Sequence, residues 1–179
     1  MARNIEIKAR IASIAALEPQ VATLAQHGPE LIEQDDSFFA CARGRLKLRA
    51  FADGRGELIA YERPDAPGPK TSSYRITPTS DPDGLRATLA SALGVAGRVR
   101  KRRWLYLIGR TRVHLDDVEG LGEFLELEVV LRDGEAAAVG VDEAHALMAR
   151  LGVPTTNLVA GAYVDLLNAQ ANHAPRPAG

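Results

Sequence analysis

Two glutamates form the clearest acidic pair of the sequence. Glu126 and Glu128 alternate with Leu125 and Leu127, a pattern typical of a β-strand with one acidic face. Their side chains would lie roughly 7 Å apart, so at an effective dielectric of about 20 the two carboxylates would repel each other by ~2 kcal/mol. Inside a closed structure such a pair needs a cation. Mg2+ and Mn2+ bind carboxylate oxygens and are commonly completed by substrate phosphates, and Glu6 could supply a third carboxylate.

Basic side chains also recur at alternate positions. Lys47 and Arg49 alternate with Leu46 and Leu48, as on a second strand. Forked guanidinium groups bind phosphate oxygens through two parallel hydrogen bonds, so such a face suits a phosphate chain. We expect this strand to repel itself when no substrate is bound, so that removal of Lys47 or Arg49 preserves or raises stability. The candidate phosphate-binding residues are Lys8, Lys47, Arg49, Lys101, Arg103 and Arg112.

The charges are sorted by sign from strand to strand. Any one of these strands, taken alone, is more simply the solvent face of an ordinary sheet. Taken together, purely basic and purely acidic strands favour a closed interior. A barrel with basic strands facing acidic ones would hold a polyphosphate chain along one wall and bridge it through a metal to the other. That arrangement serves phosphoryl or nucleotidyl transfer.

The composition predicts one soluble domain. The chain has 179 residues, enough for one well-filled core, and we assign residues 1–170 to it. Lys and Arg total 22 against 23 Asp and Glu, so the net charge of −1 gives no general attraction to nucleic acid or membrane, and we expect neither partner. Cys41 is the only cysteine, which excludes an intramolecular disulfide and fits the reducing cytoplasm. A homodimer is compatible with this composition.

Short strands dominate the hydrophobic pattern. Strand-like segments are predicted over residues 4–10, 34–41, 45–49, 57–63, 72–77, 98–108, 110–116 and 124–131. Helical spacing is predicted around residues 17–24, 82–93, 141–151 and 158–166. Gly28 and Pro29 are interpreted as the stop of the first helix. We therefore expect an α+β fold with an antiparallel sheet, followed by a disordered tail over residues 171–179.

Some reactive or aromatic residues have simpler interpretations. Cys41 follows two phenylalanines on a predicted strand with no nearby histidine, so we interpret it as core packing. Tyr163 lies on the last helical stripe, where an aromatic ring usually packs, and we leave it out of the site. His27 and His173 lack carboxylates at ligand spacing, and we expect both on the solvated surface.

Five short motifs, taken together and in this order, resemble those of the CYTH family. The family groups class IV adenylyl cyclases with thiamine triphosphatases and other triphosphate tunnel enzymes. The first motif is similar to the family's Glu-x-Glu-x-Lys strand, and the resemblance extends from Arg3 to about Leu167. The motifs are Asn4-Ile5-Glu6-Ile7-Lys8, Gln34-Asp35-Asp36-Ser37-Phe38-Phe39, Arg45-Leu46-Lys47-Leu48-Arg49, Val99-Arg100-Lys101-Arg102-Arg103 and Leu121-Gly122-Glu123-Phe124-Leu125-Glu126-Leu127-Glu128.

The resemblance implies an eight-stranded antiparallel β-barrel, a triphosphate tunnel with flanking helices, in which glutamates hold Mg2+ or Mn2+. It implies that Lys8 is catalytic, through substrate contact or proton transfer. Two positions depart from the family pattern: Asn4 stands where the signature has its first glutamate, and His114 where many members carry a metal-linked aspartate. The implied substrate-binding residues are Lys47, Arg49, Arg63, Lys101, Arg103 and Arg112, and the implied metal ligands are Glu6, His114, Glu126 and Glu128.

The implied substrate is a small molecule that bears a triphosphate: ATP, thiamine triphosphate or inorganic tripolyphosphate. The sequence most resembles class IV adenylyl cyclases, which convert ATP to cyclic AMP and pyrophosphate. A triphosphatase, in which water attacks the terminal phosphorus, stays as an alternative because the sequence does not select the nucleophile. Another alternative is a binding module that lost the metal chemistry through Asn4 and His114, although Glu126 and Glu128 argue against it.

Overall fold

A closed antiparallel β-barrel forms the centre of the computed structural model, which describes residues 2–173. The strand order around the barrel is β1-β5-β4-β3-β2-β6-β7-β8, and β1 closes the ring by pairing with both β5 and β8. The predicted eight-stranded α+β barrel is therefore confirmed. The strands are β1 Ala2–Arg10, β2 His27–Phe39, β3 Arg45–Phe51, β4 Gly56–Glu62, β5 Lys70–Thr79, β6 Val95–Ile108, β7 Thr111–Val118 and β8 Gly122–Val130.

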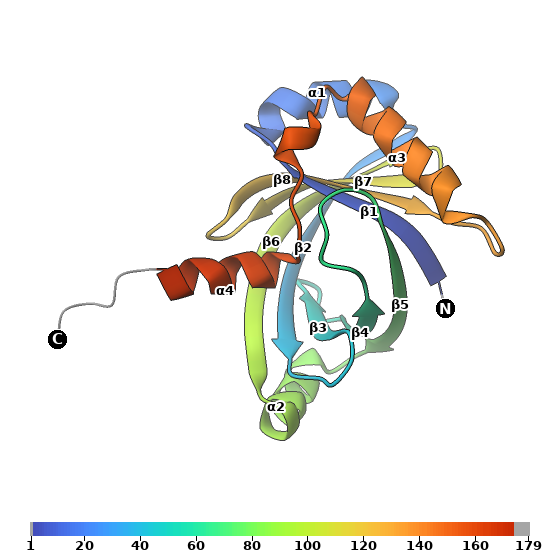
Figure 1. Ribbon diagram of the computed structural model, residues 1–179. Coiled ribbons are helices and arrows are strands. Elements are labelled where there is room, and N and C mark those ends of the chain that lie inside the picture. Colours follow the sequence, from blue (N-terminus) through green and yellow to red (C-terminus); the bar gives the residue numbers. More distant parts are fainter. Residues whose placement is uncertain (1, 174–179) are drawn as a thin grey trace.

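Helices cover the outside of the barrel (Figure 1). Helices α1 (Ile14–Leu24) and α3 (Ala137–Arg150) lie over β1, β7 and β8, whereas α2 (Pro82–Leu93) lies at the other side, near β3. Ser13 and Asp81 begin α1 and α2 by accepting hydrogen bonds from backbone N–H groups of the first turn. No helix within residues 2–173 has the length and apolar character needed to cross a bilayer.

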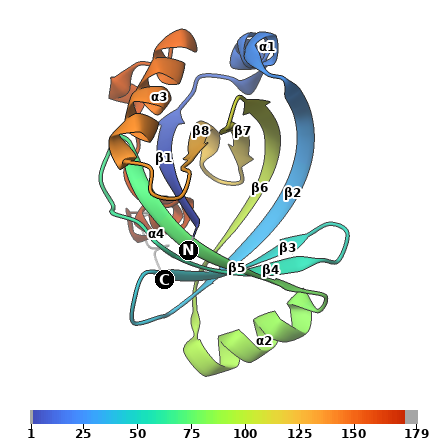
Figure 2. The ribbon, with the colours of Figure 1, turned by 90° about the vertical axis from the view of Figure 1, so that its right-hand side faces the viewer.

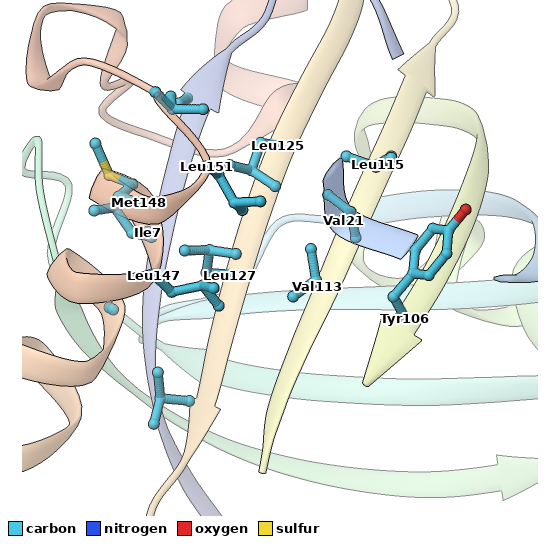
Figure 3. Packing of buried hydrophobic residues seen from close by; sticks show 14 of the residues in the cluster. Ile7, Val21, Tyr106, Val113, Leu115, Leu125, Leu127, Leu147, Met148 and Leu151 are labelled. Atoms are coloured by element: carbon cyan, nitrogen blue, oxygen red, sulfur yellow. The ribbon is translucent and has the colours of Figure 1, made fainter. Parts of the chain in front are cut away.

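The main hydrophobic core lies outside the barrel, between its wall and helices α1 and α3 (Figure 3). On β1 the apolar residues Ile5 and Ile7 point into this core, so the alternating polar residues Glu6 and Lys8 point into the barrel. Each large apolar side chain buried here contributes about 1.5–3 kcal/mol. The strands that carry the polar interior are thus held in place by their opposite, apolar faces.

One end of the barrel is crossed by the segment that leads into α4 (Tyr163–His173). Helix α4 lies at that end in Figure 1, and it lies on the far side of the ring in Figure 2. The segment is tied to β1, because Leu158 forms an isolated β-bridge with Ala9 and the Val159 N–H donates to the Lys8 carbonyl at 2.9 Å. A second apolar cluster, which includes Phe124 and Tyr163, packs beneath it.

Several predicted boundaries were wrong. Strand β2 begins at His27, so Gly28 and Pro29 lie inside a strand, where the register with β6 shifts between His27 and Glu30. Leu158 lies in the crossing segment and not in a helix. Helix α4 continues to His173, three residues into the predicted tail, and residues 174–179 lie outside the described part of the chain.

Candidate active site

A cavity of about 320 Å³ occupies the barrel interior and brings the predicted site residues together. All of the residues that the sequence nominated for substrate, metal or catalysis line it. They come from six different strands or strand ends, because alternate residues of each strand face inward. They are Glu6, Lys8, Lys47, Arg49, Arg63, Lys101, Arg103, Arg112, His114, Glu126 and Glu128.

Cross-strand register explains which of these groups meet. Lys8 lies directly opposite Glu126 in the β1–β8 pair, and His114 lies opposite the same glutamate in the β7–β8 pair. One step along β8, Glu128 faces Glu6 on one side and Arg112 on the other. Directly opposed side chains on one face of an antiparallel pair interact closely. Strand β8 therefore provides the two central carboxylates of the acidic side of the cavity.

His114, Glu126 and Glu128 form a candidate metal centre. Each offers one ligand atom, and these atoms lie within 4.8 Å of one another. Glu126 Oε2 accepts a hydrogen bond from Arg103 Nη2 at 2.7 Å, and Glu128 Oε2 lies 2.8 Å from Arg112 Nη2 in an ion pair. The other oxygen of Glu128, Oε1, lies 3.9 Å from His114 Nδ1, and Oε1 of Glu126 lies 3.9 Å from Lys8 Nζ.

Glu126 and His114 have protonation states that suit a divalent cation, whereas burial raises the pKa of the Glu128 carboxyl. Burial opposes ionisation of Glu126, but Lys8 and Arg103 outweigh it and hold the pKa of the carboxyl well below its usual range. Burial lowers the pKa of His114 well below its ordinary value, and Arg103 adds to this. His114 Nδ1 is buried without a hydrogen-bond partner. A neutral imidazole nitrogen beside carboxylates is a donor set that fits Mn2+ or a similar ion.

A buried aspartate pairs with two basic side chains of strand β3. Asp36 accepts hydrogen bonds from Lys47 Nζ at 2.8 Å and from Arg49 Nε and Nη2 at 2.8 and 2.9 Å. Arg49 and Lys47 overcome the effect of burial and hold the pKa of Asp36 far below its usual value. Asp36 offsets part of the expected repulsion within this strand, but burial and the charge of Arg49 still lower the pKa of Lys47. The effect of removing Lys47 or Arg49 on stability stays a prediction. Sequence alone missed the pairing because it depends on the β2–β3 register.

A second buried aspartate anchors the other wall. Asp116 is fully buried and accepts two hydrogen bonds from Arg103, both at 2.7 Å, while Lys101 Nζ lies at 3.4 Å. Asp116 follows His114 by two residues and so points inward from the same face of β7. From the sequence we noted that His114 replaces an aspartate of the family pattern, but we did not consider the carboxylate of Asp116 two residues later.

Tyr163 lies in the site, so its assignment to simple packing was incomplete. Its ring centroid lies 4.0 Å from Lys8 Nζ and 5.0 Å from Lys101 Nζ, and its hydroxyl donates to Asp116 at 2.9 Å. Phe124 packs against the ring edge at 4.9 Å between centroids. An aromatic face between two ammonium groups stabilises both through cation–π attraction. The helical spacing of the sequence did not predict that Tyr163, the first residue of α4, points into the barrel.

The CYTH domain model matches residues 2–163, which include every strand and Tyr163. The chain belongs to the CYTH domain family. The adenylate cyclase CyaB of Aeromonas hydrophila is 26% identical over 175 residues, covering 91% of this chain and 87% of that protein.

Solved structures share this CYTH barrel. The PH1012 protein of Pyrococcus horikoshii superposes with a TM-score of 0.82 at 24% identity, covering 91% of this chain and 98% of that one. HpAC1 of Hippeastrum, described as an adenylyl cyclase with a dominant triphosphatase activity, gives a TM-score of 0.63 at 17% identity, covering 96% and 97% of the two chains. At these identities the similarity establishes the fold.

Glu6 has a different partner from the one predicted for a CYTH metal ligand. Its Oε2 accepts a hydrogen bond from Arg63 Nη1 at 2.7 Å, and Arg63 Nη2 also donates to the Gly161 carbonyl at 2.9 Å. Glu6 faces the cavity beside Glu128, yet it lies outside the close cluster found among the described residues. Its role as a metal ligand stays a prediction, while its observed contact ties the crossing segment to the barrel.

The residues that we left out of the site, Cys41, His27 and His173, all lie on the surface. Cys41 is exposed in the loop after β2, so its assignment to the core was wrong. Strand β2 ends at Phe39, so the predicted strand does not continue to Cys41. His27 and His173 are exposed, as predicted.

Lys101 should make the affinity of this CYTH cavity for phosphate depend on pH. Burial, followed by the charge of Arg103, lowers the pKa of Lys101 to about 7. The amine is then mostly charged at pH 6 and mostly neutral at pH 8, where it no longer attracts phosphate. We expect the affinity for tripolyphosphate to fall about tenfold over this interval through Lys101. Calorimetric titration should show that Lys101→Met loses this part of the dependence; equal profiles for both proteins would assign it to another group.

Proposed function

We propose that this CYTH protein is a divalent-cation-dependent enzyme that converts ATP to cyclic AMP and pyrophosphate. The observation that carries the proposal is one cavity in which seven lysine and arginine side chains surround the His114, Glu126 and Glu128 cluster. The similarity to the Aeromonas adenylate cyclase supports the choice of ATP. The retained carboxylates support an enzyme over a module that only binds polyphosphate.

The basic side chains now pair with buried aspartates, and they would bind the phosphate chain by replacing these contacts with contacts to phosphate oxygens. Asp36 forms ion pairs with Lys47 and Arg49, and Asp116 forms one with Arg103. Arginine and lysine pairs with buried carboxylates keep these groups oriented and desolvated before substrate arrives. A triphosphate adds negative charge between the two walls without requiring the strands to move. Lys8, held against Tyr163, would contact the phosphates at the end of the cavity that Tyr163 lines.

His114, Glu126 and Glu128 would hold the divalent cation. When bound, it would neutralise charge on the phosphoryl oxygens and act as a Lewis acid. Glu6 stays a candidate for an additional ligand. Arg103 and Arg112, which hold one oxygen of each β8 glutamate, would keep those carboxylates oriented.

In the cyclase reaction the ribose 3′ oxygen forms a bond to the α-phosphorus. The bond from that phosphorus to the α–β bridging oxygen breaks, the electron pair leaves with pyrophosphate, and the hydroxyl proton passes to water. Lys8, Lys101 and Arg103 would stabilise the charge of the departing pyrophosphate. Of the two roles that the sequence motif implied for Lys8, substrate contact and proton transfer, we therefore assign it substrate contact.

A triphosphatase is the second candidate, because the same basic walls would hold the substrate for either nucleophile. Water would then form the bond to the terminal phosphorus, the β–γ bridging bond would break, and phosphate would leave together with a diphosphate. Thiamine triphosphate and inorganic tripolyphosphate are its candidate substrates. The products distinguish this reaction from cyclisation.

The proposed function predicts activity that depends on added cation and differs between metals. The purified protein would be incubated with ATP, thiamine triphosphate or tripolyphosphate, in chelator and in series of Mg2+ and Mn2+. We expect cyclic AMP and pyrophosphate from ATP, none in chelator, and half-maximal activity at a lower concentration of Mn2+, because a nitrogen ligand suits Mn2+ better than Mg2+. Orthophosphate as the product would select the triphosphatase, and no product with any substrate would contradict both reactions.

A further inference from the structure

The cavity has one sealed end and one open end. At the sealed end Tyr163 and the neighbouring lining residues Phe38 and Val99 are all buried. At the opposite end the lining residue Ile76 is 46% exposed, and Tyr74 beside it on β5 is partly exposed. The lining is therefore more exposed at the β5 end than at the Tyr163 end, and we expect a phosphate chain to enter past β5.

Strand β1 runs from one end of the cavity to the other, so the spacing of its inward-facing residues gives the distance between the ends. Lys8 contacts the Tyr163 ring, whereas Asn4 faces the same interior four residues earlier, about 13 Å along the strand. Asn4 pairs with Ser72 on β5, next to Tyr74 on the inward face. We call Asn4, Tyr74 and Ile76 the mouth. Its three side chains are uncharged, and the nearest cation is Arg112, which forms a side-chain hydrogen bond with Tyr74.

The size of the cavity leaves part of an organic triphosphate at the mouth. A volume of about 320 Å³ lies at the low end of the roughly 300–1,000 Å³ usual for small-molecule sites. The charged chain has its partners in the deep part, where Lys8, Lys101 and Arg103 lie. An attached organic group cannot leave through the sealed end, so it stays beside the mouth residues.

Asn4 carries a hydrogen-bonding group that the protein itself does not use. It is 2% exposed, lines the cavity, and its Oδ1 has no hydrogen-bond partner. Buried polar atoms without a partner are rare in folded proteins, and such an atom facing a cavity indicates a ligand. A carboxamide both donates and accepts, which suits the edge of a nitrogen heterocycle. A glutamate at this position, as in the family signature, would instead place a charge there.

We propose that the mouth is the subsite for the organic group of the substrate, a flat nitrogen heterocycle joined to the triphosphate, with Asn4 binding its polar edge and Tyr74 and Ile76 contacting its apolar faces. This inference rests on the proposed function. It makes the protein selective for ATP or thiamine triphosphate over inorganic tripolyphosphate, which has no group to occupy the mouth.

The test compares ligands with and without a heterocycle. Dissociation constants for ATP, thiamine triphosphate and tripolyphosphate would be measured for wild type, Asn4→Leu and Ile76→Ser. Asn4→Leu keeps the branched shape of the side chain and removes the amide; we expect about a tenfold loss of affinity for the organic ligand that the wild type prefers. Ile76→Ser should cost about fivefold for the same ligand. Tripolyphosphate should bind all three proteins within about twofold.

Leu31→Ser provides the matched control, because Leu31 is an apolar residue at 55% exposure that does not line the cavity. It should bind every ligand like the wild type. Equal losses for tripolyphosphate and the organic ligand, or no loss in either mouth variant, would overturn the assignment of the mouth while leaving the proposed function in place. A wild-type protein that binds none of the three ligands would overturn the proposed function and the mouth with it.

Discussion

Replacing Glu126 with Gln is expected to lower kcat/KM on the triphosphate substrate by about a hundredfold or more, while the protein stays folded. Removal of one preorganised electrostatic group from an active site typically costs 10²–10³ in rate. Glu126 is central to the acidic side, since it lies opposite both Lys8 and His114. Glutamine keeps the shape and one acceptor oxygen for Arg103, which also retains its two bonds to Asp116.

Steady-state kinetics together with direct Mn2+ titration would check this prediction. The variant should bind Mn2+ more weakly, because it loses an anionic ligand, and its circular dichroism spectrum should match the wild type. Glu119→Gln is the control: Glu119 is exposed and lies 3.8 Å from Arg100 on the outer surface. Wild-type turnover by Glu126→Gln would remove Glu126 from the mechanism.

Replacing Asp36 with Asn is expected to destabilise the protein by about 3–5 kcal/mol, because it leaves buried cations without their counter-ion. Asp36 holds Lys47 and Arg49 through three hydrogen bonds and is 2% exposed. Urea unfolding measures the change. The matched control is Asp35→Asn on the outer face, where the Arg98 partner is partly exposed and the loss should stay below about 1 kcal/mol.

Substrate phosphates and pH should both modulate this effect. Tripolyphosphate supplies the missing negative charge, so it should raise the melting temperature of Asp36→Asn more than that of the wild type. The native pKa of Asp36 is depressed, so its stabilisation is present above the unfolded pKa near 4 and is lost as pH falls below it. Equal stability of Asp36→Asn and the wild type at pH 7 would contradict the buried ion pair.

The sequence predicted the barrel and the composition of its interior because both depend on local alternation. In β1 and β8 the polar residues occupy every second position, and the structure shows those positions inside. The partners of these residues depend on register between strands distant in sequence. That is why Asp36 and Asp116, which pair with the basic groups, escaped notice.

Tyr163 escaped notice for another physical reason. Its spacing fits an amphipathic helix, and the apolar residues Ala162 and Val164 beside it do pack in the second cluster. Only the path of the chain before α4, fixed by Arg63 and by the bridge to Ala9, turns the tyrosine toward Lys8. The correct family resemblance could not supply this, since the motifs identify strands and leave the position of α4 open.

The closure of the barrel by β1 has a consequence for how the protein folds. Residues 4–10 pair with residues 124–130, so the two strands that complete the ring are separated by more than a hundred residues of chain. Contacts of such long range slow folding, because a large loop must be ordered before they form. During synthesis β1 emerges first and must wait for β8. The acidic half of the cavity, shared between these strands, can therefore form only when the ring closes.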